Sequence, residues 1–290
     1  MSDVIWTHRP ALRRPVMVAA FGGWNDAGDA ASAAVEFIRA RFEPVEVAQL
    51  DLEDYLDFTE TRPTARLVDS HTRDIDWPQT TVSAAEVHGA DNDLVIVQGP
   101  EPSLRWRRYC DTILEVAREL DVQRIITLGS LLADVPHSRP VHVTGIGSDA
   151  ALVDRLGFTP TSYEGPTGIT GVLNHHSGKS GLPSVSLWAS VPHYVAAAPN
   201  PKVALALVRA FEGAAGLAVD ASELEEAAED YDRQVSAAVA SDPEVKAFVE
   251  RLESAMDEVT EDGPDVNLPS ADMIASDFQR FLRQQRGGGA

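Results

Sequence analysis

Polar side chains suited to acid–base chemistry or ligand binding follow four strand-like apolar runs. They lie in the segments Gly22–Asp29, Gly99–Ser103, Gly129–Arg139 and Ser190–Asn200. Ligands of open parallel sheets bind beyond the carboxyl ends of the strands, so we expect these segments to meet at one rim. A further glycine-rich segment, Tyr163–Gly171, offers backbone N–H groups ahead of a short helix, where a small anion or carboxylate could bind. The candidate rim comprises Asn25, Asp26, Glu101, Ser130, His137, Arg139, Glu164, Thr167, His193 and Tyr194.

These residues also have simple structural explanations. Asp26 and Asp29 fit the N-cap of a helix, and the glycine-rich segment fits a tight turn. Glu101 stands between two prolines that hold it rigidly, so it is a stronger candidate for a specific binding or catalytic role. The sequence leaves both explanations open.

The sequence shows no complete catalytic constellation. Ser130, with Asp134 and His137 nearby, is the best arrangement for a nucleophile, but a G-x-S-x-G motif is absent. The histidines lack the H-x-x-x-H and H-E-x-x-H spacings of zinc sites. The glycines after the first strand do not fit a phosphate cradle. We therefore assign no catalytic residue, no metal and no cofactor.

The composition is that of a globular protein with a strongly acidic surface. The 290 residues are 44% hydrophobic and carry a formal net charge of -21. Phosphate binding depends on Lys and Arg, so this charge argues against nucleic acid and anionic membranes as partners. The single cysteine, Cys110, excludes an internal disulfide and fits a buried position. With no secretory signal and no apolar run of roughly 20 residues, we expect a cytoplasmic protein.

Alternating strand and helix patterns must position the rim. The main strand-like runs are Val16–Phe21, Val45–Leu50, Leu94–Gln98, Arg124–Leu128 and Val185–Ala189. Helical patterns lie between most of them, at Asp29–Arg41, Ser103–Leu120, Ser148–Leu156 and Gly168–His176, and another follows the last strand at Pro201–Ala215. This alternation predicts a three-layer α/β/α fold with a mostly parallel sheet. The segment Asp51–Asp93, broken by Pro63 and Pro78, is predicted to form a hairpin or an excursion at the sheet edge.

The character of the chain changes near Val219. Two helical patterns follow without a strand between them, Ala221–Val239 and Pro243–Val259. Between Asp220 and Asp262, fifteen acidic residues stand against three basic ones, which predicts an acidic helical hairpin. A last helix is predicted at Ser270–Gln285. We expect an α/β/α core domain at residues 1–218, a C-terminal helical appendage at residues 219–285, and a disordered tail at residues 286–290.

Four motifs together resemble the proteasome assembly chaperone 2 family, in its bacterial and archaeal branch. They are F-G-G-W-N-D-A-G-D from Phe21, T-L-G-S-L-L-A-D-V-P-H from Thr127, E-G-P-T-G-I-T-G from Glu164 and S-V-P-H-Y from Ser190. The resemblance covers about Pro15–Gly216. It implies a three-layer fold similar to nucleoside phosphorylases and peptidyl-tRNA hydrolases, and it implies homo-oligomers or heterodimers.

The resemblance also implies a function. Eukaryotic relatives assist assembly of the proteasome α-ring, and some archaeal relatives bind the proteasome core. Core-binding members can use a C-terminal hydrophobic-tyrosine-any tail, which the last residues here do not match, so tail insertion is not expected. We expect a non-enzymatic chaperone-like or scaffold protein that acts with proteasome core subunits and forms a homo-oligomer, with a trimer as the first expectation. The alternative is a small-molecule-binding protein or an enzyme, nucleosidase-, hydrolase- or ligase-like, that uses the rim.

Overall fold

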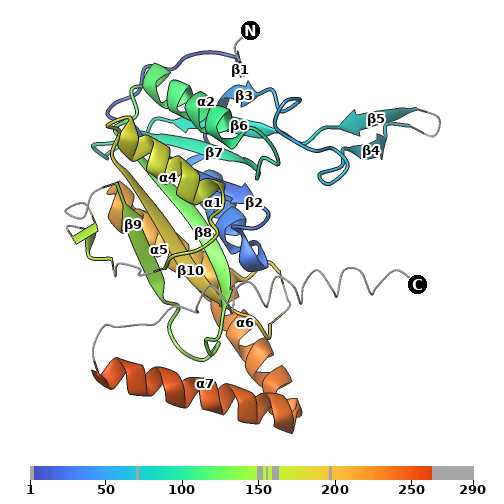
Figure 1. Ribbon diagram of the computed structural model, residues 1–290, viewed down its shortest axis with the longest axis vertical. Helices are drawn as coiled ribbons and strands as arrows, with labels where there is room; N and C mark the ends of the chain where they lie inside the picture. Colours follow the sequence, from blue (N-terminus) through green and yellow to red (C-terminus); the bar gives the residue numbers. More distant parts are fainter. Residues whose placement is uncertain are drawn as a thin grey trace.

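The structure is a computed structural model that describes residues 3–69, 72–148, 153–154, 156–158, 163–195 and 198–262. Residues 259–262 are described by their backbone only. A large sheet runs through the molecule and helices cover both of its faces (Figure 1). Its strands are β1 (Val4–Trp6), β2 (Val16–Gly22), β3 (Val45–Leu50), β6 (Thr80–Ala85), β7 (Leu94–Pro100), β8 (Arg124–Ala133), β9 (Val143–Gly147) and β10 (Ser184–Pro192). The helices are η1 (Ala27–Asp29), α1 (Ala30–Phe42), α2 (Trp106–Glu119), α4 (Ile169–Lys179), α5 (Pro201–Ala215), α6 (Ser222–Ser241) and α7 (Pro243–Asp262).

The predicted α/β/α fold is confirmed, and its sheet is mixed. The strand order is β1-β3-β6-β7-β2-β8-β10-β9. The four central strands, β7, β2, β8 and β10, are parallel to one another, whereas the outer pairings are antiparallel. A helix connects the parallel strands β7 and β8, but α4 also lies between β9 and β10, which pair antiparallel. The connection from β6 to β7 has no helix, so these two strands pair as antiparallel neighbours.

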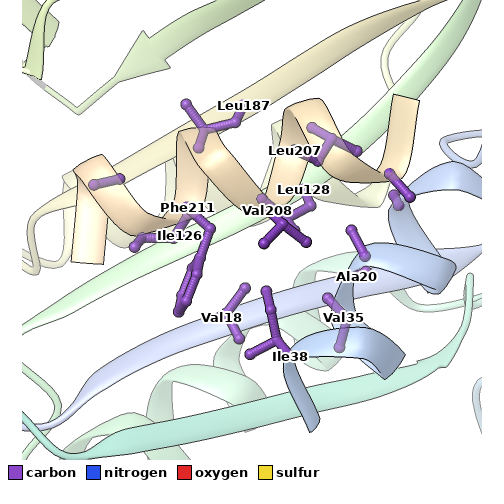
Figure 2. Close-up of a cluster of buried hydrophobic side chains, with 14 of the residues drawn as sticks. Val18, Ala20, Val35, Ile38, Ile126, Leu128, Leu187, Leu207, Val208 and Phe211 are labelled. Atoms are coloured by element: carbon purple, nitrogen blue, oxygen red, sulfur yellow. The ribbon is translucent and has the colours of Figure 1, made fainter. Parts of the chain in front are cut away.

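The central strand β2 is apolar on both faces and separates two cores. Val18 and Ala20 point into a core closed by α1 and α5, which Figure 2 shows around Ile38 and Phe211. The intervening residues of β2 point into a second core closed by α2 and α4. Because successive side chains of a strand alternate between faces, β2 contributes side chains to both cores. This double burial explains why β2 reads as a continuous apolar run.

The excursion after β3 forms a separate two-stranded hairpin. Strands β4 (Thr64–Leu67) and β5 (Arg73–Asp76) pair antiparallel, and all their residues are exposed. Figure 1 shows the hairpin projecting away from the sheet. Leu50 of β3 and Thr80 of β6 are direct partners in the sheet, so residues 51–79 close a loop on one strand pair. The predicted excursion is present, but it does not leave from the sheet edge, because β3 and β6 are internal strands that pair with each other.

The acidic helices α6 and α7 follow α5, and α6 packs against it. Leu217, Val219 and Leu224 belong to the core beneath α1 and α5, so the start of the helical pair is joined to the main body. The domain boundary after residue 218 remains a prediction. The predicted helix at Ser270–Gln285 and the tail at residues 286–290 lie outside the described residues. Over the described part of the chain, none of the helices combines the length and apolar character that a membrane span requires.

Candidate functional site

The loop after β2 buries an asparagine that joins four segments. Asn25 is fully buried, and its Nδ2 donates to Glu101 Oε1 at 2.6 Å. Its Oδ1 accepts from Thr170 Oγ1 at 2.9 Å, and its backbone carbonyl accepts from the N–H of Ser130 at 2.8 Å. The bonded partners belong to the β7 end, α4 and β8. One carboxamide and its backbone therefore tie three neighbouring elements to β2.

Glu101 completes this arrangement from the end of β7. Its backbone N–H donates to the carbonyl of Gly22 at 2.8 Å. Its Oε1 also accepts from the N–H of Ile169 at 2.8 Å, in the first turn of α4, where a carboxylate satisfies an orphan donor of the helix. We call Asn25, Glu101, Thr170 and the Ile169 N–H the amide–carboxylate clamp. In the clamp, Asn25 Nδ2 and Oδ1, Glu101 Oε1 and the Ile169 N–H are each bonded to another part of the protein.

The Asp26 side chain accepts hydrogen bonds from the start of the helix that follows it. Its Oδ1 accepts from the N–H groups of Ala31 at 2.8 Å and Ser32 at 3.1 Å, the first turn of α1. Burial raises the pKa of Asp26 above its usual value. Ser130 lies in a single bridge beside it, and the Ser130 hydroxyl donates to the carbonyl of Ala27 at 2.9 Å. The helix-capping explanation of Asp26 therefore agrees with its hydrogen bonds.

Substituting Asp26 by asparagine is expected to alter the pH dependence of stability. The raised pKa means that the folded state of the wild type binds more protons than the unfolded state. Its stability therefore falls as pH rises from 3.8, the usual pKa of an aspartate, through the raised pKa of Asp26. Asp26→Asn keeps an oxygen for Ala31 and Ser32 and loses this slope. Relative to the wild type it gains about 1.4 kcal/mol per unit of pKa elevation at neutral pH and nothing in acid.

Urea denaturation of both proteins at acidic and neutral pH measures this difference. A constant difference at both pH values would contradict the assignment, because it would show that ionisation of Asp26 is not linked to folding.

A second polar cluster lies beyond the ends of β8 and β10. Tyr194 Oη accepts from the His137 N–H at 2.6 Å and lies 2.7 Å from His137 Nδ1. His137 Nε2 lies 3.1 Å from Ser236 Oγ of α6, within hydrogen-bond distance. Burial lowers the pKa of His137, which favours the neutral imidazole. The imidazole connects the sheet to the acidic helices.

The same cluster holds α7. The rings of His193 and Tyr194 pack edge-to-face on Phe248, with centroids 5.6 and 6.0 Å apart. Arg139 forms a two-pronged ion pair with Asp257, at 2.9 and 2.7 Å. His193 Nδ1 lies 2.9 Å from Asp134 Oδ1. We call His137, Arg139, His193, Tyr194 and their partners on α6 and α7 the helix latch.

Truncating Phe248 to alanine is expected to release α7. A fully buried phenylalanine contributes about 3–5 kcal/mol against alanine, and Phe248 is half-buried, so we expect a loss of about 2 kcal/mol. Amide hydrogen exchange within α7 should accelerate about 30-fold while the central strands keep their protection. Lys246→Ala, an exposed change on the same helix, is the matched control. Unchanged exchange in both variants would show that the aromatic contacts do not hold α7.

The structure divides the candidate rim into groups. Asn25, Asp26, Glu101 and Ser130 lie together around the clamp. His137, Arg139, His193 and Tyr194 lie in the latch, with different partners. Glu164 and Thr167 are exposed in the segment before α4.

The suggested nucleophile arrangement has its members bonded elsewhere. The Ser130 hydroxyl contacts Ala27, and His137 contacts Tyr194 and Ser236. Asp134 faces His193. Cys110 is buried, and burial raises the pKa of its thiol to about 12, so it is a packing residue rather than a nucleophile.

Several residues of these clusters could not be singled out from the sequence. Thr170 and Gly168 stood out only as part of a glycine-rich segment, and Ser236 and Phe248 only as members of helical patterns. Among the described residues, no group of His, Cys, Asp and Glu has the arrangement of a metal site. Two surface grooves, of about 300 and 240 Å³, are lined by residues outside both clusters.

Comparisons with known proteins find one matching family model and several similar solved structures. The model of the PAC2 family matches residues 20–239. A PAC2 family protein from Streptomyces avermitilis is 47% identical, with 81% of this chain and 99% of that one covered and a TM-score of 0.76. A Mycobacterium tuberculosis protein described as a proteasome-assembly chaperone homologue is 43% identical, with the same coverage and TM-score.

A more distant structure shares the fold. PbaB of Pyrococcus furiosus, an archaeal proteasome activator, is 16% identical, with 82% of this chain and 99% of that one covered and a TM-score of 0.66. The comparison with curated proteins finds no match.

Proposed function

Because the chain belongs to the PAC2 family, we propose that it is a non-enzymatic chaperone-like or scaffold protein that acts with proteasome core subunits. The observation that carries this proposal is the 43% identity to the M. tuberculosis proteasome-assembly chaperone homologue, over 81% of this chain. The proposal puts the protein in the cytoplasm.

The bonding of the clamp supports a structural role. Asn25 and Glu101 lie where a ligand of an open sheet would bind, but their polar atoms bond the backbone and side chains of neighbouring elements. A substrate would have to break these bonds to reach the buried carboxamide. A small molecule that bound this carboxamide would therefore displace part of the fold.

The charge of the chain supports a protein partner with a basic surface. The net charge is -21, and α6 and α7 carry a large part of it. Complementary charge speeds association and selects partners, and its effect weakens as salt rises. Binding to proteasome subunits through α6 and α7 should therefore weaken as the salt concentration rises.

Capture with purified proteasome subunits tests the proposal. The tagged chain is mixed with free α subunits and, separately, with assembled core particles from the same organism, at low and high salt. We expect retention of α subunits or core particles at low salt and weaker retention at high salt. Retention of neither species would overturn the proposal.

A ligand screen addresses the alternative in the same preparation. Nucleosides, nucleotides and amino acids are tested for a rise in melting temperature, since a ligand at 100 times its Kd adds about 2.7 kcal/mol of stability. A rise that Asn25→Ala abolishes would support a small-molecule site at the clamp and count against a purely structural role.

A further inference from the structure

The projecting hairpin has one apolar face and one charged face. Cross-strand partners share a face, so Ala65 and Ile75 lie together, and Leu67 lies opposite Arg73. The other face carries Arg66 in ion pairs with Asp74 and Asp76. An isolated two-stranded hairpin is marginally stable in water and gains stability from packing against another surface. The apolar face is thus an unpartnered sheet face.

This face is strongly exposed. Leu67 is 65% exposed and Ile75 is 44% exposed. Trp77, the next residue in the alternation, is 52% exposed and packs one edge against Phe58, with ring centroids 5.1 Å apart. Large apolar side chains gathered on a projecting element mark interaction surfaces.

The chain also carries a groove that complements the hairpin. The groove of about 240 Å³ lies between the ends of α1, β3 and β6, and its apolar wall includes Leu12, Phe42 and Val45. Val45 is 61% exposed. Glu43 and Glu86, both exposed, line the same groove. An apolar floor with two carboxylates matches an apolar face that carries Arg73.

The groove and the hairpin of one molecule cannot meet. The hairpin leaves the sheet beyond the Leu50–Thr80 pair, and the groove lies at the other end of the same strands, beside the Val45–Ala84 pair. Five residues of extended chain separate the two ends by about 17 Å. The hairpin also projects outward from the sheet (Figure 1). A contact between the two surfaces has to join different molecules.

We propose that the hairpin of one copy seats Leu67, Ile75 and Trp77 in the groove of a second copy, with Arg73 beside Glu43 and Glu86. Local charge complementarity favours this occupant, because Arg73 of the hairpin would meet the carboxylates of Glu43 and Glu86 in the groove. Residues 61–79 hold three arginines and three aspartates, so the hairpin itself adds no net negative charge to the contact. The two contact surfaces differ, so the interface is head-to-tail and closes into a ring when its rotation allows.

Mass measurements by light scattering at micromolar concentration test the interface. The hairpin variant is Ile75→Asp with Trp77→Ser, and the groove variant is Val45→Asp. We expect the wild type to be an oligomer and each variant alone to be a monomer with an unchanged melting temperature. Leu104→Asp, at a side chain 51% exposed outside both surfaces, is the matched control and should keep the oligomer.

An equal mixture of the two variants distinguishes this interface from others. Each variant keeps one intact surface, so the mixture should form a dimer through one intact contact and should not form rings. This pairing also shows that both variants are folded. A monomeric wild type, an oligomer that survives both variants, or variants with unchanged melting temperatures that fail to pair would overturn the proposal. None of these readouts involves the proteasome, so they are independent of the proposed function.

Discussion

Replacing Gly168 by alanine is expected to lower the free energy of unfolding by about 3 kcal/mol, through overpacking and the loss of buried hydrogen bonds. A Cβ at this position would lie 1.9 Å from Asn25 Oδ1 and 2.5 Å from its Cγ and Nδ2. Asn25 is fully buried, so its side chain can move only by breaking the bonds to Glu101 and Thr170. The backbone at Gly168 is extended, so the clash and not the backbone conformation causes the loss.

Gly213 provides a matched control with the opposite sign. It lies in α5, and an added Cβ there meets no atom within 4 Å. Gly213→Ala should stabilise the protein by about 0.5–1 kcal/mol, because glycine is costly inside a helix. Urea denaturation of both variants measures the two changes. Equal effects of the two substitutions would contradict the close packing of Gly168 on Asn25.

Removing the carboxylate of Glu101 is expected to have an effect of similar size. Glu101→Ala leaves the Asn25 Nδ2 and the Ile169 N–H without their acceptor. Each unsatisfied buried donor costs about 1–3 kcal/mol, so we expect a loss of about 3 kcal/mol. The same measurement of unfolding by urea gives this value, and hydrogen exchange at the start of α4 should accelerate.

Glu101→Gln separates the hydrogen bonds from the charge. The amide oxygen can still accept from both donors, so this variant should lose less than about 1 kcal/mol, the interaction of a charge with a helix N-terminus. A glutamine variant as unstable as the alanine variant would show that the negative charge, rather than the acceptor, stabilises the clamp.

Much of the fold could be predicted from local patterns. The apolar runs at β2 and β3 and the helix Pro201–Ala215 fall where the sequence placed them, the helix because Asn200 caps it and proline fits its first turn. Strand β5 was not predicted, because Arg73–Asp76 has a single apolar residue and no face against the core. The mixed sheet was not predicted either, since strand direction depends on how the edge connections cross and not on the composition of each strand.

The candidate site was predictable in part. Asn25 and Glu101 come together because β2 and β7 are neighbouring parallel strands. The alternation of elements predicts the parallel direction, but it does not predict that these two strands are neighbours. The separation of the clamp from the latch did not follow from the sequence. Ser236 lies 99 residues beyond His137, and Phe248 lies on a separate helix from the His193 and Tyr194 rings that it contacts. A helical pattern shows which face of a helix is apolar, but it does not show where on the sheet that face lies.

The direct pairing of Leu50 with Thr80 has a consequence for how this protein can vary. The ends of residues 51–79 are already fixed by the sheet, and β4 and β5 contribute nothing to the two cores. The hairpin tip can therefore be lengthened, shortened or given a different apolar face while the strand register stays the same. A homologue could acquire a new binding specificity at this one insertion point, whereas a single-residue insertion in β2 would exchange the contents of both layers.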